Sequence, residues 1–302
     1  MTTESLRASE PRLEGSGSGP WPRPESVTEY PCGSDARRDH ELPKGVVQRE
    51  VLRTRHGTTE RVLDHIAEEV PVALVYNDAP FAVMMATPAD LDDFARGFTI
   101  TEGIASTHEI TKVEHRELLE GHELRITIPE ARAESLAARR RSLTGRSGCG
   151  LCGTEMLEAA LREPPRVTPS AFALTNEALQ AALAQLPLLQ PINALTGATH
   201  AAAWCDARGD IVLCREDVGR HNALDKLVGA MARRRIDAAI GFALVTSRAS
   251  YEIVTKAAAA GIRHVAAVSG ATALAMSIAE RTGVRLAAFA RPGSSTACGR
   301  LD

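Results

Sequence analysis

The chain has 302 residues, of which 44% are hydrophobic and 24% are charged. These proportions are typical of a globular protein, and the length leaves room for two ordinary domains. The formal net charge of -3 provides no basic excess, which argues against nucleic acid as the main partner. The start of the chain has no apolar signal-peptide core, and no later run approaches the roughly 18 apolar residues of a membrane span. We therefore expect a cytoplasmic protein without a membrane partner.

The first half of the chain predicts a tail followed by a small α+β domain. Residues 1–45 are crowded with Gly, Ser, Pro and charged residues, a composition typical of disorder. Over residues 46–145, two apolar runs separated by Asn77-Asp78-Ala79-Pro80 predict a strand hairpin. Apolar residues at helical spacing in ADLDDFARGFTITEGI predict a helix. A strand in HELRITIP and a polar helix in PEARAESLAARRRSLTGR complete this domain.

The second half, residues 146–302, predicts an α/β domain. Apolar strands in IVLC, GFALVTS, HVAAVSG and VRLAAFA alternate with helical runs, from which we expect a mostly parallel sheet. In the first of these runs, HNALDKLVGAMARRR, one helix face is apolar and is expected to pack on the sheet. This face consists of Ala223, Leu224, Leu227, Val228 and Met231.

Polar loops follow four of the expected strands. The loops CREDVGRHN, TSRAS, VSGAT and RPGSS are rich in small, hydroxyl and charged residues, and three of them carry an arginine: Arg220, Arg248 and Arg291. Ligands of open α/β sheets bind beyond the carboxyl ends of the strands, where arginine can hold phosphate bidentately. Each loop alone is more simply explained by helix capping, but the four together favour a phosphate-bearing ligand. The chain has no Walker or Rossmann glycine pattern, so we do not expect ATP or NAD in a standard cradle.

The stretch SGCGLCGTE holds Cys149 and Cys152, a Cys-x-x-Cys pair flanked by glycines. Structural zinc needs four ligands, an iron–sulfur cluster needs further cysteines nearby, and a thioredoxin-type pair belongs near the start of its domain. The glycines favour a mobile loop that presents sulfur to different partners. The upstream arginines would favour the reactive thiolate if they lie close, although a solvated helix face is the simpler interpretation. The other cysteines are expected to be bystanders: Cys32, Cys205, Cys214 and Cys298.

Several long motifs, taken together and in order, resemble the formate dehydrogenase accessory sulfurtransferases, the FdhD family. They are SGCGLCGTE, ALTGATHAAAW, REDVGRHNALDKLVGA and TSRASYEIVTKAAAAGI, and the resemblance runs from about Val46 to about Arg291. It implies a cytoplasmic sulfur carrier that takes persulfide sulfur from a cysteine desulfurase. The acceptor would be the bis-molybdopterin guanine dinucleotide molybdenum cofactor of formate dehydrogenase. The resemblance also implies a cytidine-deaminase-like three-layer α/β/α domain without a protein-ligated metal, and a homodimer.

The same resemblance assigns roles to individual residues. Cys149 is expected to carry the persulfide, with Cys152 assisting or sharing the sulfur. Glu216 and Asp217 could accept hydrogen bonds from guanine, although acidic residues before a helix are equally well explained by the helix dipole. The cofactor is expected to contact the segment after the last strand, where Pro292 and a short C-terminus depart from the family pattern, together with residues of the other loops. These residues are Phe289, Ala290, Arg291, Pro292, Gly293, Ser294, Arg220, His221, Arg248 and Ser269.

A second function from a different class is a non-catalytic chaperone that binds the molybdenum cofactor and inserts it into formate dehydrogenase. In that case the cysteines would serve only for docking. Sulfur added to Cys149 or Cys152 by a desulfurase distinguishes the carrier from the chaperone, because thiolates are the sulfur acceptors.

Overall fold

The computed structural model describes residues 42–145 and 164–298. The described residues belong to one compact unit. Most of the predicted tail lies outside them, but Leu42–Gly45 are described and lead directly into the first strand, with the amide of Val46 donating to the carbonyl of Pro43. The predicted domain boundary at residue 145 adjoins the gap and stays a prediction. Within the described residues, no helix is long and apolar enough to cross a membrane.

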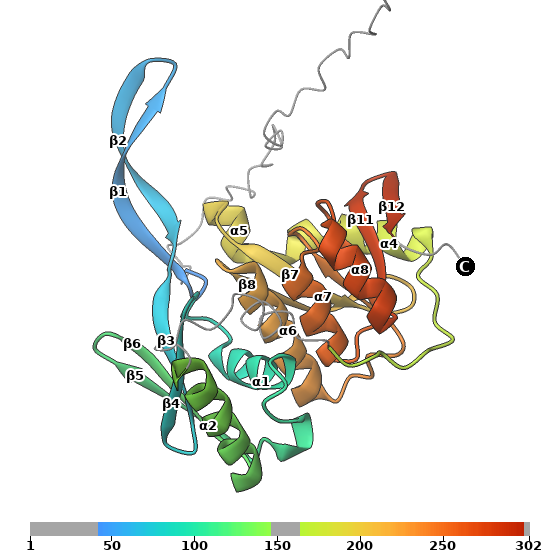
Figure 1. Cartoon of the computed structure of the whole chain (residues 1–302). Helices are drawn as coiled ribbons and strands as arrows, with labels where there is room; N and C mark the ends of the chain where they lie inside the picture. The colour runs from blue at the N-terminus through green and yellow to red at the C-terminus, as the bar shows by residue number, and fades with distance from the viewer. Residues whose placement is uncertain (1–41, 146–163, 299–302) are drawn as a thin grey trace, which may run out of the picture. The chain divides into compact units, whose positions relative to one another are not determined.

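The first two strands form a sheet of their own, which the sequence patterns did not predict. Strands β1 (Val46–Arg55) and β2 (Thr58–Ala67) pair in antiparallel register over their full length (Figure 1). Leu52 and Leu63 remain 67% and 64% exposed. Because both faces of this hairpin are largely open to solvent, its sequence lacks the alternation of apolar and polar residues that marks a half-buried strand.

A four-stranded sheet in the order β4-β3-β6-β5 follows, and it confirms the predicted hairpin. Its turn is formed by Asn77 and Asp78, which adopt φ angles of 43° and 68°, as a two-residue hairpin turn requires. Helix α1 supplies Phe94 and Phe98 to the core under the sheet, where Tyr76 is also buried. The elements are β3 (Val70–Tyr76), β4 (Ala79–Ala86), α1 (Leu91–Thr101), η1 (Thr107–Glu109), β5 (Lys112–Leu118), β6 (Gly121–Thr127) and α2 (Glu130–Gly145).

The second sheet has six strands in the order β12-β11-β10-β9-β7-β8. The four predicted strands, β8, β9, β10 and β11, run in one direction as expected, but two further strands, β7 and β12, run the other way and make the sheet mixed. Pairs β9–β10 and β10–β11 are parallel, whereas β7–β8, β7–β9 and β11–β12 are antiparallel. The physical reason is that β7–β8 and β11–β12 are joined by short turns, and a parallel pair needs a long crossover. The strands are β7 (His200–Cys205), β8 (Ile211–Asp217), β9 (Phe242–Val245), β10 (His264–Ala267), β11 (Arg285–Arg291) and β12 (Ser294–Cys298).

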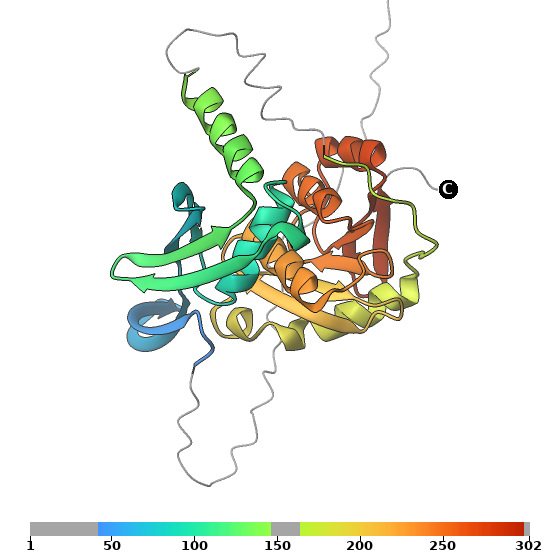
Figure 2. The same cartoon turned by 90° about the horizontal axis from the view of Figure 1, so that it is seen from below.

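Helices cover both faces of this sheet and make three layers (Figure 2). Side chains of α6, α7 and α8 pack with Trp204 and Val265 on one face, whereas α4 packs with Phe242 and Leu244 on the other. The three layers agree with the expected α/β/α arrangement, while the likeness to cytidine deaminases stays a prediction. The helices are α4 (Asn176–Gln185), η3 (Leu186–Leu189), α5 (Pro191–Thr196), α6 (Arg220–Arg234), α7 (Tyr251–Ala259) and α8 (Ala273–Thr282).

Helix α6 joins the two halves of the described structure. Its predicted apolar face packs on the six-stranded sheet, but every residue from Asn222 to Met231 is buried, because α1 covers the opposite side. The crossing is close: a Cβ atom at Gly97 of α1 would collide with the carbonyl of Asp225, and one at Gly229 of α6 would collide with the carbonyl of Asp93. Ion pairs surround this crossing: Lys256 of α7 pairs with Asp225 of α6 (3.0 Å) and with Glu102 at the end of α1 (2.8 Å), and Arg215 of β8 pairs with Asp93 of α1 (2.8 Å).

Candidate functional site

Strands β8, β9, β10 and β11 run in one direction, so their carboxyl ends lie at one edge of the sheet. Helices α6, α7 and α8 begin at this edge. Backbone hydrogen bonds tie the loops together: Ala249 donates to Gly270, Thr272 donates to Ala249, and Phe289 donates to Ser269, at 2.9–3.1 Å. The edge therefore brings the four polar loops of the sequence together on a rigid support.

The helix N-termini at this edge differ in how they are capped. Ser250 and Thr272 accept backbone hydrogen bonds from the first turns of α7 and α8, whereas α6 begins after Gly219 without a side-chain cap. The first backbone N–H groups of a helix have no partner within the helix, and they bind anions readily. Helix α6 consequently offers uncapped N–H donors where the sequence predicted a phosphate ligand.

Arg220 and His221 lie in the first turn of α6 and face Glu252 of α7. Nε2 of His221 is 2.8 Å from Oε2 of Glu252, although not in hydrogen-bond alignment, and a guanidinium nitrogen of Arg220 is 3.8 Å from the same oxygen. Nε of Arg220 and Nε2 of His221 are buried without a hydrogen-bond partner among the described residues. Because buried polar atoms are nearly always satisfied, these two nitrogens are consistent with a ligand or water that completes the site.

Burial acts on the histidines of this edge. It lowers the pKa of His221, and the charge of Arg220 lowers it further, while Glu252 opposes both effects. Burial and the charge of Arg220 also lower the pKa of His200, whose Nδ1 lies 3.5 Å from the hydroxyl of Thr246. Both imidazoles are therefore held toward the neutral form, in which each ring can donate one hydrogen bond and accept another.

Arg248 and Ser269 lie where the sequence placed them, after β9 and β10. Arg248 is exposed, and its guanidinium forms no hydrogen bond or ion pair within the parts of the chain that the structure describes. Ser269 is half-buried and uses its carbonyl to accept the hydrogen bond from Phe289. The Arg248 side chain is thus available to a ligand and has no structural partner among those residues.

The segment Phe289–Ser294 forms the end of β11, a turn and the start of β12. Phe289 has a φ of 50° at a break in the β11–β12 register, and its ring lies over Gly270, where an added Cβ would be 3.0 Å from it. A left-handed backbone is costly for a bulky residue, and such strain is concentrated at functional sites. Half of the Phe289 side chain is exposed, so its ring offers an apolar surface at this edge.

One of the expected contacts in this segment needs correction. Ala290 is fully buried in the core against α4, so its side chain cannot touch a cofactor. Gln180 of α4 holds the turn by donating to the carbonyl of Arg291 (3.2 Å) and accepting from the amide of Gly293 (2.7 Å). The chain then returns as β12, a strand that the sequence patterns did not predict although Pro292-Gly293 is a turn signal.

The suggested role of Glu216 and Asp217 as guanine acceptors is wrong. Glu216 accepts hydrogen bonds from the amides of Ile192 and Asn193, at 2.9 and 2.8 Å, and thereby caps α5. Asp217 is fully buried and forms a 2.6 Å ion pair with Lys226. Both carboxylates are therefore fully engaged within the fold, and neither is open to a ligand.

Comparison with known proteins decides the family. A family model described as the FdhD/NarQ family matches residues 67–297. The chain belongs to the FdhD/NarQ family. A protein named sulfur carrier protein FdhD from Xanthomonas euvesicatoria pv. vesicatoria is 56% identical over 248 residues, which cover 82% of this chain and 88% of the relative. One of the same name from Cupriavidus necator is 51% identical over 245 residues, covering 81% and 85%.

A solved structure shares the fold of this FdhD/NarQ chain. It is the crystal structure of a "putative formate dehydrogenase accessory protein" from Desulfotalea psychrophila, with a TM-score of 0.66. The match covers 85% of this chain and 97% of that protein at 21% identity. At that identity the likeness supports the fold alone.

The two cysteines that the sequence singles out, Cys149 and Cys152, lie outside the described residues, as does Cys32. Burial raises the pKa of the Cys205 thiol well above its usual range and that of Cys214 to about 12, where the nearby Glu216 adds to the effect. Thiols held in the protonated form are poor nucleophiles. This supports the expectation that Cys205 and Cys214 are bystanders of sulfur chemistry.

Sequence reasoning did not single out His200, Thr246 or Glu252 as members of this edge. His200 begins β7 and Thr246 directly follows β9, so their proximity follows from the antiparallel β7–β9 pairing. Glu252 reaches His221 from another helix. The available signal was that His200, Thr246 and Glu252 all fall within motifs that resemble the FdhD family. In the described ranges, 42–145 and 164–298, no group of three or more His, Cys, Asp or Glu side chains could hold a metal ion.

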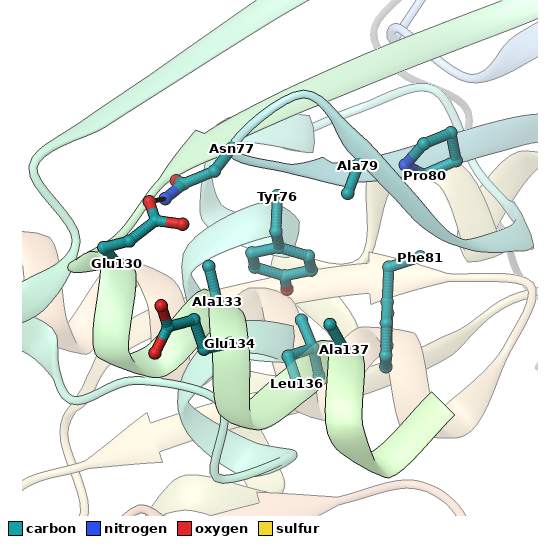
Figure 3. Close-up of a pocket in the computed structure, with 10 residues that line it drawn as sticks. All are labelled: Tyr76, Asn77, Ala79, Pro80, Phe81, Glu130, Ala133, Glu134, Leu136 and Ala137. Carbon is teal, nitrogen blue, oxygen red and sulfur yellow. Dashed lines mark hydrogen bonds between the residues drawn. The ribbon is translucent and has the colours of Figure 1, made fainter. Parts of the chain in front are cut away.

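A separate pocket of about 200 Å³ lies between the β3–β4 turn and α2 (Figure 3). Figure 3 shows the ring of Tyr76 and the side chain of Phe81 facing Leu136 of α2, with Glu130 and Glu134 on the same helix. None of its lining residues is a predicted site residue. Because small-molecule pockets usually exceed about 300 Å³, this pocket is too small for the expected dinucleotide cofactor.

Proposed function

We propose that this chain is a sulfur carrier that acts in the cytoplasm and delivers persulfide sulfur to the bis-molybdopterin guanine dinucleotide cofactor of formate dehydrogenase. The proposal that the chain binds this cofactor rests on one observation. Four predicted binding residues lie at one sheet edge: Arg220, His221, Arg248 and Ser269. The names of the relatives, sulfur carrier protein FdhD, support the proposal that the chain carries sulfur. Proposed partners are a cysteine desulfurase, formate dehydrogenase and a second copy of the chain.

The first chemical step is a persulfide exchange at Cys149. The Cys149 thiolate attacks the outer sulfur of the persulfide on the desulfurase, so a new sulfur–sulfur bond forms on Cys149. The sulfur–sulfur bond of the desulfurase breaks, and its cysteine leaves as a thiolate. No external oxidant is required, because the transferred sulfur keeps its oxidation state. The nucleophile is a thiolate, which favours Cys149, with glycines on both sides in the sequence, over the buried Cys205.

The second step releases the sulfur at the level of sulfide, which requires two electrons. The Cys152 thiolate supplies them when it attacks Sγ of Cys149. A Cys149–Cys152 disulfide then forms, and hydrosulfide leaves for the cofactor. Cellular thiols reduce the disulfide before the next cycle. This step gives Cys152 a defined role as the resolving cysteine.

The sheet edge holds the cofactor through its phosphates and a guanine base. The N–H groups at the start of α6 lack a side-chain cap, and the guanidinium of Arg248 is exposed and has no partner among the described residues, so both are suited to bind phosphate. The exposed ring of Phe289 provides a face on which guanine can stack, an interaction that contributes about 1–3 kcal/mol per base.

Complementation in cells tests the function. Cells that lack their own sulfur carrier for formate dehydrogenase should regain formate dehydrogenase activity when they express this chain. The Cys149→Ala variant should restore none, and Cys152→Ala should restore less than the wild type. Cys205→Ala is the matched control and should restore full activity. Full activity with Cys149→Ala would contradict sulfur transfer and favour the non-catalytic chaperone.

A further inference from the structure

Two histidines lie together on the β5–β6 hairpin, away from the sheet edge described above. His115 is on β5 and His122 is on β6, and the antiparallel register pairs Glu117 with His122 and His115 with Leu124. Residues directly opposite in antiparallel strands point to the same face. His115, Glu117 and His122 therefore share one face of the hairpin.

The two imidazole rings are in direct contact through nitrogen atoms. Nε2 of His115 is 2.9 Å from Nδ1 of His122, and the ring centroids are 4.8 Å apart. A transition metal binds imidazole nitrogen at about 2.0–2.1 Å. Two such ligands at neighbouring corners of a square or octahedral site are about 2.9 Å apart, and in a tetrahedral site about 3.4 Å. The observed separation therefore fits the first arrangement without rearrangement of the backbone.

We propose that His115 and His122 form a two-imidazole site for a divalent transition-metal ion of the Ni²⁺ and Cu²⁺ class, whose square or octahedral geometry matches the separation of the two nitrogens. In the metal-free protein one ring nitrogen donates its proton to the other in a hydrogen bond. When the metal binds, that proton moves to the other nitrogen of its own ring, and both facing nitrogens offer lone pairs. The two imidazoles are the protein ligands, and water fills the remaining positions.

The charges around the pair are mixed. Burial, His122 and Lys44 lower the pKa of His115, while Glu117 raises it. Lys44 repels a cation and Glu117 attracts one, so their effects oppose each other. Because the ligands come from two strands, a bound ion would link β5 to β6 and stabilise the hairpin.

A titration of the full chain with Ni²⁺ tests the site. The chain contains nine histidines, and paramagnetic Ni²⁺ broadens the NMR signals of those that it contacts. With histidine side chains labelled, the signals of His115 and His122 should broaden first, at less than one equivalent of metal. This readout is resolved by residue, so metal bound by cysteines elsewhere in the chain does not obscure it.

Variants complete the test. His115→Ala and His122→Gln should each weaken this Ni²⁺ binding at least tenfold, and His56→Ala, which removes a histidine from the β1–β2 turn, should leave it unchanged. Melting temperatures in EDTA that match the wild type would show that the variants are folded. Ni²⁺ should raise the melting temperature of the wild type and of His56→Ala but not that of the two pair variants. Broadening that begins at His56 or His108, or affinity unchanged in both pair variants, would overturn the proposal.

Discussion

Lys226 and Asp217 form an ion pair that is wholly buried, with Nζ 2.6 Å from Oδ2 and both side chains fully excluded from solvent. Asp217 also accepts hydrogen bonds from the amides of Thr87 and Gly219, and Lys226 donates to the carbonyl of Thr87. The pair therefore fastens the end of β4 to β8 and α6, directly beneath the sheet edge. Burial lowers the pKa of Lys226, while Asp217 opposes that shift.

Removal of one partner of this pair should be strongly destabilising. We expect Asp217→Asn or Lys226→Met to lower the free energy of unfolding by about 3–5 kcal/mol, because each leaves an uncompensated buried charge. The double variant should lose less than the sum of the two single variants, since it leaves neither charge alone. Urea denaturation measures the free energy of unfolding of the two single variants and of the double variant. A loss below about 1 kcal/mol in both single variants would show that water or another group reaches the pair.

Arg248 should contribute to nucleotide binding and not to stability. Arg248→Ala removes a charge-assisted contact worth about 1.5–3 kcal/mol, so the affinity for GDP should fall tenfold or more. The matched control is Arg208→Ala: this arginine is 81% exposed in the turn between β7 and β8, at the opposite edge of the sheet. Calorimetric titration should show unchanged affinity for the control. Equal dissociation constants for Arg248→Ala and the wild type would remove Arg248 from the site.

Phe289 should show opposite effects on stability and binding. Glycine adopts a φ of 50° without the steric cost that phenylalanine meets. We therefore expect Phe289→Gly to leave the free energy of unfolding unchanged or to raise it by up to about 1 kcal/mol. The same variant should bind GDP more weakly, because the stacking face is lost. Urea denaturation measures the free energy of unfolding of the variant, and calorimetric titration measures its affinity for GDP. A variant that is less stable than the wild type but binds GDP normally would show that Phe289 has a purely structural role.

His264 should make the protein sensitive to acid. Burial, followed by the charges of Arg263 and Arg285, lowers the pKa of this histidine to about 4 in the folded protein, whereas it is about 6.5 in the unfolded chain. The unfolded state therefore binds more protons between these values, and stability is lost as the pH falls from 6.5 toward 4. The contribution is on the order of 2–3 kcal/mol.

The His264→Gln variant isolates this contribution. The difference in unfolding free energy between wild type and variant should change as the pH is lowered from 7 to 4.5, with the wild type losing more. Urea denaturation at several pH values provides the measurement. A difference that stays constant with pH would mean that His264 does not titrate in this window.

The sequence was sufficient for the elements that have a strong hydrophobic period. The β3–β4 hairpin, α1 and the sheet-facing side of α6 were expected and are present. Hairpin β1–β2 was missed because neither face is buried deeply enough to impose alternation on its side chains. Strand β7 was not predicted, because its short apolar run HAAAWC has no period that distinguishes a buried strand from a buried helix segment.

The candidate site was predictable only in part, for a related reason. Motifs and strand ends located Arg220, Arg248 and Ser269, since loop chemistry is local. Whether a carboxylate is free depends on distant partners. Asp217 accepts a hydrogen bond from the amide of Thr87, 130 residues earlier in the chain, and Glu216 accepts hydrogen bonds from the amides at the start of α5. The sequence does not show these partners, so it left both carboxylates as candidates for guanine binding. Similarly, the contact of Glu252 with His221 required the packing of α7 beside α6.

The central claim is that Cys149 carries sulfur as a persulfide, and mass spectrometry of the intact chain and its peptides tests it most directly. After incubation with a cysteine desulfurase and cysteine, the Cys149 peptide of the wild type should gain one sulfur, about 32 Da, which a reductant removes. Cys152→Ala should retain the added sulfur longer, because the resolving thiol is absent, and Cys205→Ala should behave as the wild type. A chain that gains no sulfur at Cys149 under conditions in which the desulfurase itself is persulfidated would contradict the account.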